Sequence, residues 1–317
     1  MKMLQRLPIL ILPWLCLVAI IACKRASTSG EDIQEEENGS TGPLTVMTTF
    51  YPTQYFAQRI AGDLAEVTCP IPEDADPIFW MPDATTIQRY QKADLIVLNG
   101  AGFEKWIEVV SLPQSAVTDT AKNLTEAFIS YENAAVHQHG PEGEHTHEGI
   151  DGHTWLDPNN AKAQSRAILE ALLTKLPGHQ KQLNEAYQSL ADELDQLDAD
   201  FKALKLPPML CSHPAYNYLA RRYSWTIHNL DLDPDSPLSK EAMANMRDVL
   251  SSFPASHLLW ESEPLEATSK QLSNELALQS LTISPCELLS STEQSAGHDY
   301  LKVMKANLVA LQAIGIK

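Results

Sequence analysis

The residues of this 317-residue chain best suited to metal chemistry are its ten histidines and its many carboxylates. Four histidines, His137, His139, His145 and His147, lie in the segment VHQHGPEGEHTHEG together with three glutamates. Imidazole and carboxylate are ligands of divalent transition metals, and His-rich tracts are typical of metal binding. With Gly and Pro but no apolar periodicity, residues 132–151 are predicted to form a loop that binds metal weakly, because binding must first order it. The alternative is a solvated insertion whose histidines are incidental.

Two other histidines lie where a folded site would form. His153, in GHTWLDPNNA, precedes a helix that Asp157 or Asn159 would cap. His213, in SHPAYNYLARRY, follows a predicted strand, and open α/β sheets bind ligands beyond the carboxyl ends of their strands. From position alone, each imidazole could be a ligand or a buried structural group.

Further polar side chains follow predicted strands. Asp76 comes after the second strand, Glu261 ends the strand HLLWE, and Ser284 and Cys286 end the last strand in TISPC. Each taken alone is better explained as a turn or cap residue. Together they would surround a crevice between two α/β lobes.

The elements that must position these residues alternate between short apolar runs and helical patterns, which is typical of α/β folds with parallel sheets. We expect an N-terminal lobe over 44–176 and a C-terminal lobe over 206–317, each with a mostly parallel sheet flanked by helices. A helix over 177–205, on the order of 40 Å long at 1.5 Å per residue, would join the lobes rigidly.

The individual elements follow from the same patterns. Strands are predicted over 44–50, 65–71, 94–98, 116–119, 208–212, 226–232, 257–261 and 281–284. Helices are predicted over 52–61, 83–92, 103–110, 159–176, 177–204, 214–223, 239–253, 266–277 and 300–314, with Ser239 as a cap.

The N-terminus predicts export and a membrane anchor. Basic residues precede an apolar run that is interrupted by two prolines and is too short to span a bilayer, so residues 1–22 read as a signal peptide. The residues before Cys23 (Ile-Ile-Ala) resemble a bacterial lipobox, which implies lipidation of Cys23; cleavage nearby without lipid is the alternative. Residues 23–43 would then be the lipidated cysteine and a flexible tether. This places the protein in the cell envelope, on the periplasmic or extracellular face, and leaves open which membrane holds it.

Net charge, cysteine count and the absence of catalytic motifs argue against a nucleic-acid-binding protein, a disulfide-rich protein and an enzyme. A net charge of −18 argues against a nucleic-acid partner, since phosphate binding needs clustered Lys and Arg. Cys69, Cys211 and Cys286 remain after export, so at most one disulfide is possible, and whether Cys211 pairs with Cys286 is open. No HExxH, GxSxG or similar motif is present, so we expect a protein that is not an enzyme.

The series TTFYPTQYFAQRIAGD, ADLIVLNGAGFEKW, the His-rich insertion, HTWLDPNNA, SHPAYNYLARRY and DYLKVMKANLVAL resembles, in this order, the substrate-binding lipoproteins of ABC importers for zinc and manganese. The resemblance implies capture of a divalent metal, most often zinc with manganese possible, between two lobes. It also implies that the protein delivers the metal to an ABC permease in the membrane. We expect the protein to be a monomer.

The resemblance implies four ligand positions, of which this chain matches two. His153 and His213 occupy the second and third, and imidazole at the third suits zinc. Ile78 stands where the first histidine is expected and Ser284 where the last acid is expected. Asp76, Glu261 and Cys286 are the candidates to complete the shell.

Two other interpretations remain. A family member that has lost these ligands would bind another ligand or a partner protein. A secreted zinc-dependent hydrolase would also use two histidines and a carboxylate, although a catalytic zinc keeps one position open for water.

Overall fold

The computed structural model describes residues 42–131, 135–138, 144–147 and 149–315, and the chain from Gly42 onward forms one compact unit. The predicted signal peptide, Cys23 and tether lie outside the described residues. Among those described, no helix is both long enough and apolar enough to cross a bilayer.

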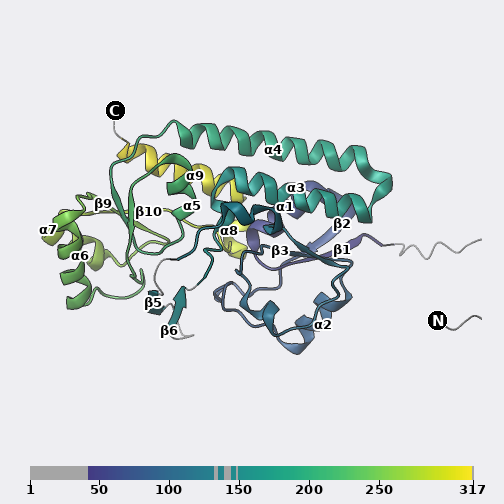
Figure 1. Cartoon of the computed structure of the whole chain (residues 1–317), viewed down its shortest axis with the longest axis horizontal. Coiled ribbons are helices and arrows are strands. Elements are labelled where there is room, and N and C mark those ends of the chain that lie inside the picture. The colour runs from purple at the N-terminus through teal and green to yellow at the C-terminus, as the bar shows by residue number, and fades with distance from the viewer. Residues whose placement is uncertain (1–41, 132–134, 139–143, 148, 316–317) are drawn as a thin grey trace, which may run out of the picture. The chain divides into compact units, whose positions relative to one another are not determined.

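The first sheet is parallel throughout and has the strand order β2-β1-β3-β4 (Figure 1). The inner strand β3 is buried along its whole length, as its uninterrupted apolar run predicts. Helices α1 and α3 pack against each other and against this sheet. The elements are β1 (Leu44–Thr48), α1 (Tyr51–Ala61), β2 (Ala65–Thr68), α2 (Ala84–Lys92), β3 (Leu95–Leu98), β4 (Val117–Asp119) and α3 (Pro158–Lys175).

The second sheet is also parallel and has the order β10-β9-β7-β8. The order reverses between the adjacent strands β7 and β9, so their carboxyl ends form the kind of switch point where α/β sheets bind ligands. Its elements are β7 (Met209–Cys211), α5 (Asn217–Tyr223), β8 (Ile227–Asn229), α6 (Lys240–Ser252), β9 (His257–Trp260), α7 (Glu266–Leu276), β10 (Gln279–Thr282), α8 (Ser291–Ser295) and α9 (Tyr300–Ile314).

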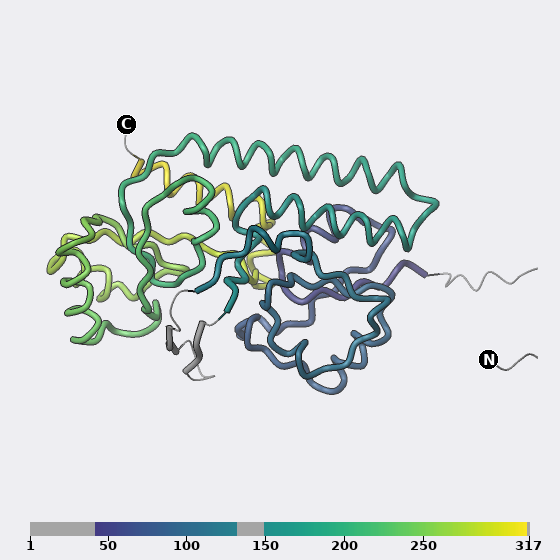
Figure 2. The backbone as a smooth tube through the Cα atoms, in the orientation of Figure 1, coloured from purple at the N-terminus to yellow at the C-terminus, as the bar shows by residue number. Residues whose placement is uncertain are grey.

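Helix α4 (Gln180–Lys202) is the predicted connector between the two sheets, and a 3-10 turn over Pro177–His179 leads into it. Its 23 residues span about 35 Å at the rise of an α-helix. It packs along α1 and α3 and also on α9, and Figure 2 shows it running beside both halves of the folded unit. One apolar stripe, including Leu183, Leu190, Leu194 and Phe201, is buried in these contacts, which makes the connection stiff.

Three expectations about elements are corrected. The helix predicted over 103–110 is only a 3-10 turn, Lys105–Glu108, because the side chain of Glu104 turns inward to accept hydrogen bonds from the chain after β3. The helix expected from Pro214 begins at Asn217. The His-rich segment is not an irregular loop throughout, because β5 (Ala135–Gln138) and β6 (Glu144–His147) pair as an antiparallel ribbon.

The expected cap at Ser239 is confirmed, since its side chain accepts a hydrogen bond from the Ala242 amide. Asp157, and not Asn159, caps α3 by accepting from the Asn159 amide. Within the described part of the chain all three cysteines, Cys69, Cys211 and Cys286, are free thiols, so Cys211 and Cys286 do not pair.

Candidate metal centre

His153 is fully buried in the turn between the ribbon and α3. The chain passes here so close to Phe103 that a Cβ on Gly152 would lie 2.9 Å from the Phe103 ring. The His153 ring has Nδ1 2.7 Å from Asp151 Oδ1 and Nε2 3.1 Å from Glu287 Oε1. Burial opposes protonation of this ring, but the two carboxylates outweigh it and raise the pKa of His153 to about 10. The imidazole is thus held with Nε2 directed at Glu287.

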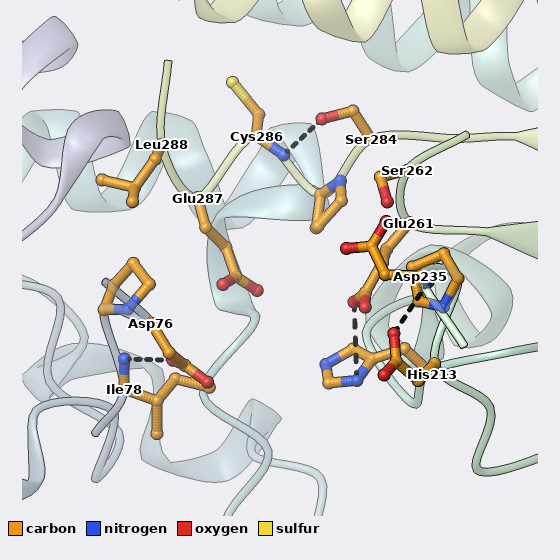
Figure 3. A pocket seen from close by; sticks show the side chains of 14 residues that line it. Asp76, Ile78, His213, Asp235, Glu261, Ser262, Ser284, Cys286, Glu287 and Leu288 are labelled. Carbon is orange, nitrogen blue, oxygen red and sulfur yellow. Dashed lines mark hydrogen bonds and ion pairs between the residues drawn. The ribbon is translucent and has the colours of Figure 1, made fainter. Parts of the chain in front are cut away.

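His213 follows β7 at the switch point of the second sheet, where the sequence predicts a ligand. Its ring is nearly perpendicular to that of His153, with 5.4 Å between the ring centroids. Glu261 follows the neighbouring strand β9, and its Oε2 lies 3.6 Å from His213 Nδ1. The other ring nitrogen lies on the side turned toward Asp76 and Glu287 (Figure 3). The two imidazoles predicted to share an ion are therefore close enough to do so.

Glu287 is the acidic residue that the sequence analysis missed. It ends the segment Ile283–Glu287 after β10, whose backbone is held from both halves of the molecule. Trp155 Nε1 donates to the Pro285 carbonyl at 2.8 Å, and the Tyr216 hydroxyl donates to the Ile283 carbonyl at 2.5 Å. The side-chain amide of Asn307 accepts a hydrogen bond from the Ser284 backbone N–H at 3.0 Å and donates to the Ser284 carbonyl at 2.7 Å. These bonds set the position of the Glu287 carboxylate.

The ligand atoms of His153, His213 and Glu287 all lie within 4.8 Å of one another. Two imidazoles and a carboxylate at this spacing can coordinate one divalent transition metal. A cavity of about 330 Å³ opens beside them, lined also by Asp76 and Glu261. The structure therefore brings together one ligand from the first half of the chain and two from the second.

The cavity concentrates negative charge. Burial, together with the nearby carboxylate of Glu287, raises the pKa of Asp76 to about 6 and that of Glu261 to about 8. Figure 3 shows the side chains of Asp76, Glu261 and Glu287 directed into the same space as the His213 ring. A bound dication would relieve this repulsion, so the electrostatics favour a cation.

The remaining predicted site residues are placed as follows. Ile78 and Ser284 line the cavity wall but carry no metal ligand. The Cys286 thiol is buried, burial raises its pKa well above the usual range, and in Figure 3 it points away from the carboxylates. The prediction that Cys286 completes the shell is therefore not supported; the carboxylate after the last strand comes from the next residue.

Of the four histidines predicted to bind metal in the His-rich segment, three lie in the β5–β6 ribbon. His137 and His145 occupy facing register positions of the β5–β6 pair, and His147 faces Ala135. His139 lies outside the described residues.

Comparison with known proteins decides the family. Residues 46–314 match the model of the ZnuA family, described as zinc-uptake complex component A, periplasmic. The chain belongs to this family. Membership confirms the resemblance inferred from the motifs. It also places the protein outside the cytoplasm, in association with the cell envelope.

Relatives and a solved structure agree with this assignment. The zinc-binding lipoprotein AdcA of Streptococcus pneumoniae is 26% identical over 312 residues, which are 96% of this chain and 60% of AdcA. The high-affinity zinc uptake system protein ZnuA of Bacillus subtilis is 26% identical over 314 residues, 94% of each chain. The chain thus spans about 60% of the length of the first relative and nearly all of the second.

The crystal structure of the metal-dependent lipoprotein YcdH of Bacillus subtilis superposes with a TM-score of 0.74 at 24% identity, covering 86% of this chain and all of that one. This likeness confirms the ZnuA-family fold of two parallel-sheet lobes joined by a long helix.

Proposed function

We propose that this ZnuA-family protein captures Zn²⁺ in the cavity between its lobes and delivers it to an ABC permease. The observation that carries the proposal is the convergence of His153, His213 and Glu287 within 4.8 Å. The names of the relatives AdcA and ZnuA support zinc as the cargo. Nitrogen donors favour zinc over the harder manganese ion, although manganese remains a second candidate.

Asp76 is the proposed fourth ligand, and Glu261 is proposed to orient His213. Each histidine has a carboxylate beside Nδ1, Asp151 for His153 at 2.7 Å and Glu261 for His213 at 3.6 Å. The hydrogen bond to Asp151 keeps the proton of His153 on Nδ1, so that Nε2 binds the metal, and in this proposal Glu261 moves within hydrogen-bond distance of His213 to do the same when zinc is bound. Asp76 comes from the opposite wall and lies near both Glu287 and His153. A shell of two imidazoles and two carboxylates closed by protein groups suits a carrier.

The delivery step needs a membrane anchor and a partner. We propose that residues 1–22 direct export, that Cys23 carries the lipid, and that residues 23–43 tether a monomeric body near the permease. The histidines of the ribbon segment form a second, weaker zinc-binding set in this proposal, because fixing four side chains around an ion costs conformational entropy.

Zinc affinity measured by chelator competition on the full-length protein tests the proposal. We expect submicromolar binding by the wild type, weaker binding of manganese, and loss of the tight site in His153→Ala and His213→Ala. His298→Ala, at an exposed histidine, is the control and should bind zinc like the wild type. Tight zinc binding that survives both cavity substitutions would contradict the site. A wild type that binds neither metal would favour a degenerate family member.

A further inference from the structure

Asp151 contacts both halves of the proposed zinc site without being a ligand. Its carboxylate is fully buried. Oδ1 accepts a hydrogen bond from the His153 amide at 3.0 Å and lies 2.7 Å from His153 Nδ1. One oxygen therefore holds both the backbone and the ring of the same histidine.

The second carboxylate oxygen reaches the other lobe. Asn217 Nδ2, at the start of α5, donates to Asp151 Oδ2 at 2.9 Å and also to the carbonyl of Pro214 at 2.9 Å. Pro214 directly follows His213. The amide of Asn217 thus ties the carboxylate that holds one histidine to the turn that carries the other.

The backbone of Asp151 reinforces this connection. Its carbonyl accepts a hydrogen bond from the Tyr218 hydroxyl at 2.7 Å, the residue after Asn217. Asn217 is itself fixed by Asn229, whose Nδ2 donates to its Oδ1 at 2.8 Å. The orientation of the Asn217 amide, with NH₂ toward Asp151, is therefore set by its other partners.

We infer that Asp151 and Asn217 are positioning residues that set the separation and orientation of the two zinc-binding imidazoles across the lobes. The inference rests on the proposed zinc function. Asp151 keeps the proton of His153 on Nδ1 and leaves Nε2 for the metal, and Asn217 holds Asp151 in register with the turn after His213.

The arrangement of donors gives a specific test. In Asp151→Asn the new amide has one oxygen and one NH₂ group, yet donors face it from both sides, His153 on one and Asn217 on the other. One side must then pair donor with donor. Asn217→Asp alone instead places two carboxylates side by side. Combining the two substitutions exchanges donor and acceptor and restores complementary pairing between residues 151 and 217, while the Pro214 carbonyl loses its donor just as it does in Asn217→Asp alone.

Zinc affinity by chelator competition on the full-length protein is the measurement. Asp151→Asn should weaken zinc binding by about 10–100-fold, as loss of outer-shell partners of metal-bound histidines does. The double variant should bind zinc more tightly than Asn217→Asp, because both lose the donor to Pro214 but only Asn217→Asp brings two carboxylates together. Asp157→Asn, six residues further on, is the matched control: asparagine still caps α3, and zinc affinity should remain that of the wild type.

A nuclear magnetic resonance signal separates positioning from folding. In the zinc-loaded wild type the His153 Nδ1 proton should exchange slowly, and in Asp151→Asn it should exchange fast. If Asp151→Asn does not fold, Asn217→Ala, which removes only the second contact, should still weaken zinc binding and speed this exchange. Wild-type affinity in Asp151→Asn, or a double variant no tighter than Asn217→Asp, would overturn the inference. Failure of the wild type to bind zinc would overturn the proposed function instead.

Discussion

Two regions of the molecule shield a glutamate from solvent, Glu104 almost fully and Glu261 in part, and its charge is compensated differently in each. Glu104, in the first lobe, accepts hydrogen bonds from the Thr49 hydroxyl and from the amides of Asn99 and Gly100 at 2.5, 2.6 and 3.2 Å. Burial raises its pKa to about 7, and its hydrogen-bond donors limit the rise. Neutral donors from the first lobe surround this carboxylate.

Glu261, in the metal cavity, faces other carboxylates. Burial comes first and the charge of Glu287 second in raising its pKa to about 8, while His153 partly offsets them. From this difference we expect a carboxylate of the chain to be structural where neutral donors surround it, and to belong to a cation site where carboxylates from several elements converge.

The largest expected effect is on the increase in the free energy of unfolding that zinc binding produces. At free zinc about 1,000 times the dissociation constant, binding should raise the free energy of unfolding by about 4 kcal/mol. Glu287→Gln removes a ligand and should abolish most of this increment, whereas Glu104→Gln should retain it. Chemical unfolding with zinc and with a chelator measures both. An increment that persists in Glu287→Gln would mean that Glu287 does not bind the ion.

The next effect is the pH dependence of the zinc-free protein. Because the pKa of Glu104 is about 7 in the folded state and near 4.5 when unfolded, the folded state holds the extra proton between these values. Stability should therefore fall by about 3 kcal/mol as pH rises from 4.5 through 7. In Glu104→Gln this part of the fall should be missing. Urea unfolding of both proteins across this range checks it, and identical pH profiles would contradict the assignment.

Much of the fold followed from local sequence patterns. Helix α9 has the predicted bounds, and Ser239 caps α6 as expected, because caps and periodicity act over a few residues. The β5–β6 ribbon was missed because its pairing joins segments that are not adjacent in the sequence. The only β-branched residues in these two strands are Val136 and Thr146, which pair with each other. Glu104 was missed as a buried carboxylate because its partners come from other loops.

The site was predicted in part. His153 and His213 were found because each lies at a recognisable junction, before a capped helix and after a strand. The family resemblance put the last acid at Ser284, but the chain continues as an irregular segment in which Cys286 has a positive φ of 59°. Such a backbone is not readable from residue types, and it brings the carboxylate of Glu287 within 4.8 Å of the two imidazoles.

The smallest effect distinguishes the two remaining cavity carboxylates. If Asp76 is a ligand and Glu261 only orients His213, Asp76→Asn should weaken zinc binding by about 100-fold and Glu261→Gln by about 10-fold. Asp235→Asn, at the exposed rim of the same cavity, controls for the general loss of negative charge and should change affinity little. Chelator competition at constant ionic strength gives all three values. A larger loss in Glu261→Gln than in Asp76→Asn would reverse the two roles, because the carboxylate that touches the ion must cost more to remove than the one that holds a ring.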